Sequence, residues 1–600
     1  MIRLLASLAL AAMASTATVP PPTPLSVPLS PEPVAAPHAR LPGFAAMLIE
    51  RPLESGGAAW PGLADAAAWR ADIVGGVAAR QSSRWTYARS LIARRRGGAA
   101  LGVLDVMATD DPDLAMVPAW RRARGAALTL LRRQDDAVAA LADDRLAGDA
   151  EACLWRMRAL AEGGQGVPAL VQLRCALPAL YPRTAADRYP FLIAAGSAAV
   201  AAGRYRAARE WLNALPATDI AANLLRGRAT AAMGDLRGGR LLLDRVLLRG
   251  TPEQRAAARL ALIESNVAAD AIAPAMALKQ LRALCFGWRG GEIERRALWL
   301  SLRLADRVDD APAALAAGAV LFRYYQNGAQ TNELAALLQT HLAKALAPGT
   351  TIPLAQGAGL FWAYRDLMPS GVEGDRLVEM LAARLQVVGL YGRAADLLRY
   401  RLTAHAEDIE QGPLSIRVAG LFILAGKPEK AIAALRDTDA FAYPPEMHAD
   451  RRRIEAAALD LLGRPDEALA TIQDVAGSEA LRAEIRWRAR DWAGYVAEAE
   501  ATLPRPGALN EVSQAVILRQ AIALAMLGRE DALASLNAHY ARAFAGLPTA
   551  ATFAMLTEQV GAIDPTALGD ALASLPSASP AGELGDLIAA GDAARDRGPG

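Results

Sequence analysis

Glu264 and Ser265 stand side by side in the segment ALIESNVAADAIAPAMALKQL, residues 261–281, and small residues and an Ala-Pro-Ala turn follow them. A carboxylic acid kept protonated in an apolar pocket can act as a general acid at neutral pH. Glu264 is therefore a candidate general acid.

The pair resembles the Glu-Ser motif of lytic transglycosylases, the enzymes that cleave peptidoglycan. That family continues with an aromatic residue, a serine and a glycine-rich turn. Here Val267 and Ala273 occupy the aromatic and serine positions, and Met276 and Lys279 occupy two of the glycine positions. A motif without its structural context is weak evidence. We therefore expect an ordinary helix, and a transglycosylase-like enzyme with Glu264 as the acid is the alternative.

Other patterns of catalysis and metal binding are missing from the sequence. It contains no HExxH, no GxSxG and no Walker loop, which mark zinc proteases, serine hydrolases and phosphate-binding loops. Its five histidines are scattered along the chain. We therefore expect a protein that is not an enzyme and that holds no cofactor and no metal.

The N-terminus has the pattern of a secretory signal peptide. Arg3 supplies the positive charge, residues 4–14 are apolar apart from Ser7, and small residues up to position 17 offer a cleavage site. Pro20 follows too soon for a membrane anchor, which needs about 20 apolar residues. We expect a signal peptide at residues 1–17, a proline-rich linker at residues 18–43, and a periplasmic or secreted protein without an integral membrane span.

The composition favours helices. The chain has 600 residues, too many for one compact core, and is 53% hydrophobic but only 5% aromatic. Its apolar content is mostly alanine and leucine, which form helices more readily than sheets. The formal net charge of +2 lacks the strong basic excess of a general nucleic-acid binder. We expect several domains or an extended repeat array, with no nucleic acid as partner.

Several segments share one local pattern, in which an apolar helical stretch is followed by a glycine, a few polar residues and a second amphipathic helix. The glycines of these segments are Gly203, Gly234, Gly426, Gly463 and Gly528, and weaker copies lie near Arg133, Gly389 and Asp491. The first two glycines are 31 residues apart, and Gly426 and Gly463 are 37 residues apart. Since glycine can end a helix in the left-handed conformation, the pattern predicts repeated helical hairpins.

The pattern resembles the tetratricopeptide repeat (TPR), a helical hairpin of about 34 residues. GRPDEALA, which begins at Gly463, matches the turn glycine, the acidic pair and the small alanine of the second helix, Ala468. Ala208 and Ala431 occupy the same position in other units, where a larger side chain would overpack the contact between the two helices. The resemblance implies an all-α, TPR-like right-handed α-solenoid of helical hairpins over most of residues 44–546.

A fold of this kind implies a non-catalytic scaffold that binds a partner peptide or helix in the groove of the solenoid. The stretch LFWAYRDLMPSGVEGDRL, residues 360–377, also resembles exported repeat proteins of alphaproteobacteria. That resemblance implies a location outside the cytoplasm, so we expect the partner to be a protein of the cell envelope.

Residues 347–376 interrupt the repeats because prolines and glycines crowd there. We expect this junction to separate an N-terminal array, residues 44–346, from a C-terminal array, residues 377–546, with a loosely ordered helical tail at residues 547–600. Within the junction, the candidate partner-binding residues are Phe361, Trp362, Tyr364 and Arg365, because their types are enriched at binding hot spots. The alternative is that the aromatic rings fill the core of the junction.

One segment has a marked excess of positive charge. Eleven arginines lie between Arg80 and Arg133, against four aspartates. If these arginines share one groove, they suit an anionic partner. The alternative is an ordinary solvated exterior.

Two of the three cysteines lie close in sequence. Cys153 and Cys175 fall on helices that we expect to be neighbours. In an oxidising compartment they form either a disulfide or two buried thiols, and the sequence leaves both alternatives open.

Overall fold

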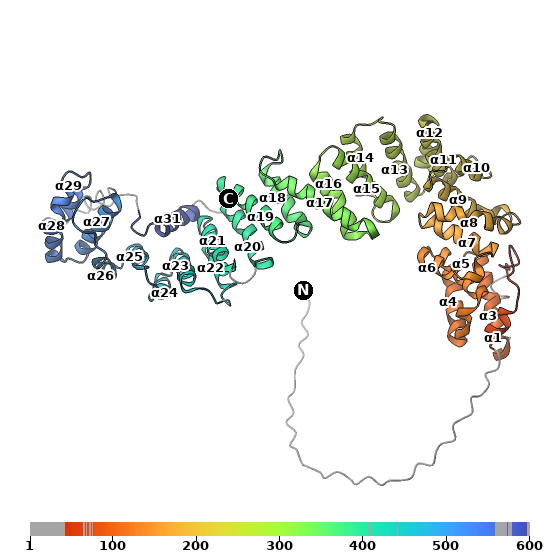
Figure 1. The fold of residues 1–600 in the computed structure, drawn as a ribbon, viewed down its shortest axis with the longest axis horizontal. Coiled ribbons are helices and arrows are strands. Elements are labelled where there is room, and N and C mark those ends of the chain that lie inside the picture. The colour runs from red at the N-terminus through yellow and green to blue at the C-terminus, as the bar shows by residue number, and fades with distance from the viewer. Residues whose placement is uncertain are drawn as a thin grey trace, which may run out of the picture. The chain divides into compact units, whose positions relative to one another are not determined.

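The computed structural model describes residues 43–63, 67, 69, 70, 74, 76–406, 410–440, 442–557, 573 and 579–596. The expected signal peptide and nearly all of the expected linker lie outside these ranges. Within them, the chain consists of helices and the turns that join them, and no strand occurs (Figure 1). None of the helices in the described part combines the length and the apolar character needed to cross a bilayer. The all-α fold class is confirmed.

The chain divides into two compact units, the first ending at Gly250 and the second beginning at Thr251. We call the first helix of each hairpin its A helix and the second its B helix. The first unit contains α1 (Phe44–Ile49) and the hairpins α3 (Gly76–Ala93) with α4 (Gly97–Asp110), α5 (Pro118–Leu130) with α6 (Gln134–Ala140), α7 (Ala150–Glu162) with α8 (Gly166–Leu180), α9 (Ala185–Ala201) with α10 (Tyr205–Asn213), and α11 (Ile220–Ala232) with α12 (Leu236–Arg249).

The second unit continues the same arrangement of hairpins. Its pairs are α13 (Pro252–Ala268) with α14 (Pro274–Gly287), α15 (Gly291–Arg307) with α16 (Ala311–Tyr324), α17 (Thr331–Leu346) with α18 (Leu354–Tyr364), α19 (Val372–Val387) with α20 (Tyr391–Ala404), α21 (Gln411–Leu424) with α22 (Pro428–Arg436), α23 (Pro445–Leu461) with α24 (Pro465–Ile472), α25 (Glu479–Arg488) with α26 (Trp492–Glu500), and α27 (Glu511–Met526) with α28 (Glu530–Phe544). In the part of the chain that the structure describes, α29 (Ala550–Thr557) and α31 (Glu583–Asp596) follow these hairpins.

The division between the units differs from the junction expected at residues 347–376. Those residues lie inside the second unit, where they form the loop between α17 and α18, helix α18 itself, the segment before α19 and the first turn of α19. The three helices pack on one another. The prolines belong to the turns on either side of α18, whereas Gly357 and Gly359 lie inside α18 and Gly374 lies inside α19.

The turns between A and B helices explain the glycine pattern. Gly203, Gly234, Gly426, Gly463 and Gly528 all have φ between 65° and 99°, a left-handed conformation that glycine adopts without steric cost. Other turns place Arg95, Arg132, Asp270, Asp309 and Arg490 in the same conformation. The hairpins therefore continue through segments that have no glycine at the turn between the A and B helices.

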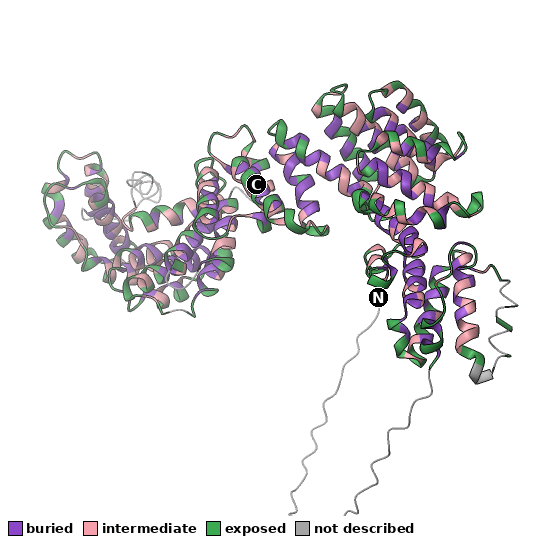
Figure 2. Cartoon of the chain, turned by 45° about the vertical axis from the view of Figure 1, so that its right-hand side comes forward, coloured by how far each residue is buried: buried purple, intermediate pink, exposed green. Residues whose placement is uncertain are grey.

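Small side chains allow the A and B helices to approach closely. Ala208, Ala431 and Ala468 are fully buried on their B helices. On α12 the same position is Gly239, where an added Cβ would lie 2.8 Å from the carbonyl oxygen of Gly227 on α11. Even an alanine would be too large for this contact, since real Cβ atoms do not come so close. Figure 2 shows that the buried residues lie on the sides of the helices that face other helices.

Candidate partner-binding surface

Glu264 and Ser265 lie inside α13, which continues unbroken to Ala268. The turn follows at Asp270, so residues 261–281 form a helical hairpin. The Glu264 carboxylate accepts a hydrogen bond of 2.6 Å from Nη2 of Arg296 on α15, and 29% of the Glu264 side chain is exposed. A partly exposed carboxylate that faces a guanidinium differs from the apolar pocket that a glycosidic general acid requires.

The four candidate residues at positions 361–365 do not form one site. Phe361 is fully buried, and its ring packs edge to face against Trp362 and against Tyr400 of α20. Tyr364 lies in a separate contact, with the guanidinium of Arg323 5.7 Å from its ring centroid. Phe361 therefore fills the core, which is the role that the alternative interpretation assigned to the aromatic residues.

The remaining two candidates form an outer cluster with Tyr400. The Arg365 guanidinium lies 5.7 Å from the Trp362 ring and 5.9 Å from the Tyr400 ring. Trp362 is 39% exposed and borders an open cavity of about 530 Å³, whose lining also includes Arg393 and Asp396. This cluster of Trp362, Arg365 and Tyr400 joins the B helices α18 and α20.

Most of the positive charge between Arg80 and Arg133 is engaged within the first unit. The ion pairs are Arg84 with Asp110, Arg89 with Glu54, Arg121 with Asp143, Arg122 with Asp149, Arg124 with Asp105, and Arg133 with Asp136. Arg89 also donates hydrogen bonds to the backbone carbonyl oxygens of Ala58 and Ala59. The arginines therefore link helices and loops to one another, which favours the interpretation as an ordinary exterior.

Cys153 and Cys175 form a disulfide, with their Cα atoms 5.9 Å apart. The bond joins α7 to α8, the two helices of one hairpin. Of the two alternatives left open by the sequence, the structure therefore has the disulfide. The third cysteine, Cys285, is a buried free thiol.

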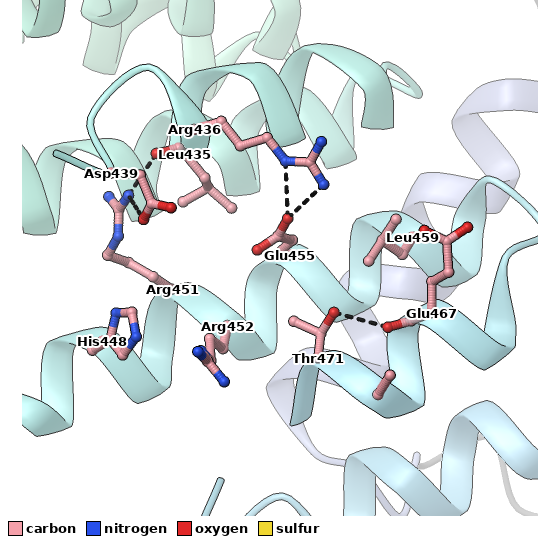
Figure 3. A pocket seen from close by; sticks show the side chains of 11 residues that line it. Leu435, Arg436, Asp439, His448, Arg451, Arg452, Glu455, Leu459, Glu467 and Thr471 are labelled. Atoms are coloured by element: carbon pink, nitrogen blue, oxygen red, sulfur yellow. Dashed lines mark hydrogen bonds and ion pairs between the residues drawn. The ribbon is translucent and has the colours of Figure 1, made fainter. Parts of the chain in front are cut away.

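An open cavity of about 440 Å³ lies among α22, α23 and α24 (Figure 3). Its charged lining includes Arg436, which pairs with Glu455 at 3.0 Å. Arg451 is 3% exposed and donates hydrogen bonds to the carbonyl oxygen of Leu435, at 2.5 Å, and to Oγ1 of Thr438, at 3.0 Å. These pairings hold the hairpin of α21 and α22 to the hairpin of α23 and α24, and we assign no ligand to the cavity.

The strongest candidate for a partner-binding surface is one that a helix already covers. Helix α31 packs against α21, α23 and α25, the A helices of three consecutive hairpins (Figure 1). We call the covered part of these A helices the docking surface. Ile588 of α31 is 1% exposed and belongs to the same apolar core as α21 and α23, and Leu584 and Leu587 pack against that core. Their spacing places these three side chains on one face of α31.

An arginine provides the polar contact between α31 and the docking surface. Arg488 of α25 donates a hydrogen bond of 2.7 Å to Asp460 of α23, and its Nη2 lies 2.6 Å from a carboxylate oxygen of Asp592 on α31. Burial raises the pKa of Asp460, the positive charge of Arg488 opposes this shift, and the negative charges of Asp592 and Glu484 add to it. The three charged groups are coupled, so that docking of α31 changes the electrostatics of the surface beneath it.

Two glycines bring the backbones of α31 and the docking surface into contact. A Cβ added to Gly591 would lie 2.9 Å from Cδ1 of Leu461 and 3.0 Å from Cγ2 of Ile423. On the other side, a Cβ added to Gly426 would lie 2.9 Å from the backbone nitrogen of Arg595. The Arg595 guanidinium also donates a hydrogen bond to the carbonyl oxygen of Leu461. The fit therefore depends on shape as well as on charge.

Two segments of the tail expected to be loosely ordered at residues 547–600 are packed helices, and residues 558–572, 574–578 and 597–600 of that tail lie outside the described residues. Helix α29 packs against α27 and α28, and α31 packs on the docking surface. The sequence contains a local signal for α31, since Leu584, Leu587, Ile588 and Gly591 lie on one face of a helix. It contains no local signal for the place where that face binds, and the docking surface was missed.

The fold and this surface define an all-α protein of stacked helical hairpins that holds one of its own helices across its A helices. No family model matches the sequence, and the comparison with curated proteins found no match. Among solved structures, 62 chains match. A crystal structure of the P58(IPK) TPR domain is 17% identical, with a TM-score of 0.18, over 64% of this chain and 99% of that one. A structure of Naa15/Naa10 bound to HypK-THB is 12% identical, with a TM-score of 0.21, over 80% and 77%.

Proposed function

We propose that this protein is a non-catalytic scaffold of the cell envelope and that it binds a helix of a partner protein on the docking surface. The observation that carries the proposal is the seating of α31 across three consecutive A helices. A surface that buries the apolar face of one helix and pairs its carboxylate has the chemistry needed to bind another helix. Recognition of an amphipathic helix through spaced apolar anchors is a common mode of protein binding.

The binding role requires no reacting residue. The anchors of α31 are apolar side chains, and its polar contacts are an ion pair and a hydrogen bond to a backbone carbonyl. Binding energy in such interfaces is concentrated in a few buried anchors and in the charged groups that they shield from water. For a partner helix, we expect Ile423, Leu461 and Arg488 to be the most important contacts.

We further propose that the mature protein is periplasmic or secreted. The signal-like N-terminus supports this location. The disulfide between Cys153 and Cys175 also supports it, because disulfides form and persist in oxidising compartments and are rare in the cytosol. The partner is then a protein of the envelope.

The test is crosslinking in living cells that express the full chain with an affinity tag, followed by identification of the captured protein. All compared chains carry Gly591→Leu, which weakens the contact of α31 with Leu461 and Ile423 and so uncovers the docking surface. Arg488→Gln is added to change that surface, and Glu264→Gln is added as the matched control, because it changes an ion pair elsewhere in the second unit. We expect the same envelope protein with Gly591→Leu alone and with the control, and at least a tenfold loss of it when Arg488→Gln is added. Cell fractionation of the wild type tests the location, and a cytosolic chain would contradict it.

Two results would contradict the scaffold proposal. Equal capture by Gly591→Leu with and without Arg488→Gln would show that the partner binds elsewhere on the chain. Recovery of glycan fragments that depends on Glu264 would support the transglycosylase alternative.

A further inference from the structure

We propose that α31 is an intramolecular competitor of the partner and that the partner presents an acidic amphipathic helix of the same design. This inference rests on the proposed function. It adds the chemistry of the partner helix and a closed state of the chain in which its own last helix covers the docking surface.

The position of α31 departs from the packing rule of the hairpins. Helices of a repeat stack contact mainly their neighbours in sequence, but α31 follows α29 in sequence and packs on α21, α23 and α25. The hydrogen bond from Arg595 to Leu461 spans 134 residues of sequence. Helix α31 is therefore bound to the stack as a ligand would be, through one face and from outside the order of the repeats.

The contacts of α31 specify the chemistry of a helix that fits the surface. Leu584 and Ile588 provide two apolar anchors that are four residues apart, and Gly591 provides the close approach to Ile423 and Leu461. Asp592, next to that glycine, meets Arg488. A partner helix needs the same order of two apolar anchors, a small residue and an adjacent carboxylate.

The charge of α31 supports an acidic partner. The helix contains four acidic residues, Glu583, Asp586, Asp592 and Asp596, against one basic residue, Arg595. Arg488 joins the buried side chain of Asp460 to the carboxylate of the docked helix. Loss of that carboxylate removes a charged partner from a guanidinium that is only about a quarter exposed, which we expect to weaken binding markedly.

Attachment in one chain gives α31 an advantage over a free helix. A tethered segment is present at an effective concentration on the order of millimolar, without any new contact. A free helix with the same contacts can bind only while α31 is off the docking surface. Its apparent affinity is therefore its affinity for the open surface multiplied by the fraction of chains that are open. A change that releases α31 but spares the surface should raise the apparent affinity for a free helix.

The probe is a fluorescein-labelled peptide with the sequence of residues 581–596, and the receptor is the full chain. Asp592→Asn in the chain removes the ion pair of its own α31, and Gly591→Leu creates a clash with Leu461 and Ile423. Both variants leave α21, α23 and α25 unchanged. We expect each to bind the peptide at least about tenfold more tightly than the wild type by fluorescence anisotropy. The matched control is Asp586→Asn on the exposed side of α31, and it should bind as the wild type does.

Two further variants test whether the peptide occupies the docking surface. Addition of Arg488→Gln to the Gly591→Leu chain should remove most of the gained affinity. A peptide that carries Asn in place of Asp592 should bind the Gly591→Leu chain at least about tenfold more weakly than the original peptide. Equal binding of the peptide to the wild type, Asp592→Asn and Gly591→Leu would overturn the proposal.

Hydrogen exchange on the wild-type chain separates a displaceable helix from a permanent part of the core. If α31 opens by itself, its amides should exchange faster than those of α21 and α23. Equal protection of the three helices would overturn the proposal, and so would cooperative unfolding of the second unit in Gly591→Leu.

The tests distinguish failure of this inference from failure of the proposed function. If no chain binds the peptide but capture of the envelope partner still depends on Arg488, the competitor role of α31 is wrong and the scaffold remains. If capture of the partner does not depend on Arg488 either, both proposals are wrong.

Discussion

The indole of Trp60 donates a hydrogen bond to the fully buried carboxylate of Glu151, which lies 91 residues further along the chain. The same carboxylate accepts a hydrogen bond of 3.0 Å from Nε1 of Trp155 and forms an ion pair with Arg183. The backbone N–H of Gly56 donates a further hydrogen bond of 3.2 Å. One acidic side chain of α7 thus connects the segment before α3 with the residues that lead into α9. A buried charge is stable only when it is paired in this way.

Glu151→Gln should destabilise the first unit strongly. The neutral amide leaves the guanidinium of Arg183, whose side chain is 6% exposed, without its counter-charge. We expect a loss of about 3 kcal/mol in the free energy of unfolding, measured by denaturant titration of the tryptophan fluorescence. Glu162→Gln breaks a more exposed ion pair with Arg158, and its effect should stay below about 1 kcal/mol. Equal effects of the two variants would contradict the assigned role of Glu151.

Two glycine-to-alanine substitutions should have opposite effects on stability. Gly463 has φ of 73° and nothing within 4 Å of an added Cβ, so Gly463→Ala introduces only backbone strain. We expect it to cost about 1 kcal/mol. Gly420 lies within α21, also with nothing within 4 Å of an added Cβ, and alanine there should stabilise the helix by up to about 1 kcal/mol. Thermal unfolding of both variants tests the assignment of Gly463 to the turn, and a stabilising Gly463→Ala would contradict it.

How much of the fold is predictable from the sequence depends on how local each signal is. The hairpins were predictable where a glycine ends the A helix, as at Gly463, because the left-handed turn favours glycine. The signal was weaker at Arg490, where the sequence showed only a faint copy of the pattern near Asp491, and the turn at Asp309 was not predicted, since these residue types adopt the left-handed conformation rarely. The crowding of proline and glycine at residues 347–376 predicted a boundary, because composition does not distinguish a long turn from a division between units.

The division at Gly250 has no distinct signal of its own. Thr251 caps α13 by accepting a hydrogen bond from the backbone N–H of Gln254, and the Gln254 side chain accepts one in return from the backbone N–H of Thr251. This capping box marks the start of a helix anywhere in a chain. The docking of α31 was equally unpredictable, because the partners of Asp592 and Arg595 are contributed by distant hairpins.

Asp143 should make the stability of the first unit depend on pH. Hydrogen bonds from the Arg145 side chain, together with the nearby charge of Arg121, lower the pKa of Asp143 to about 2. Because the pKa is lower in the folded chain than in the unfolded chain, the stabilisation is complete above about pH 5 and is lost as pH falls from about 4 toward 2.

Asp143→Asn tests this dependence. We expect the variant to be less stable than the wild type by about 1 to 2 kcal/mol at neutral pH, and the difference should shrink as the solution becomes acidic. Denaturation midpoints at a series of pH values measure it, with Asp135→Asn on the exposed side of α6 as control. A difference that stays constant down to pH 3 would contradict the lowered pKa.

The disulfide should contribute measurably to stability. It closes a loop with a sequence separation of 22 residues between Cys153 and Cys175, and a loop of this size contributes about 3 kcal/mol in the chain-entropy account. Dithiothreitol should lower the unfolding temperature of the wild type and leave that of the double Cys-to-Ser variant unchanged.

Burial raises the pKa of the Cys285 thiol to about 11, so the native oxidised chain should not react with Ellman's reagent. Rapid labelling of the native chain would contradict this assignment.

Phe361 and Trp362 are neighbours in sequence, but we expect truncation of Phe361 to lower the stability of the second unit far more than truncation of Trp362. Phe361→Ala removes a fully buried ring and should cost about 3 to 4 kcal/mol of stability in the second unit. Trp362 is 39% exposed, so Trp362→Ala should cost less than half as much and leave a folded chain for binding studies. Crosslinking in cells then tests the outer cluster, because the proposed partner contacts the A helices α21, α23 and α25, and this cluster lies on the B helices α18 and α20. Unchanged capture by Trp362→Ala is the expected result, and a loss of capture would place the partner on the outer cluster.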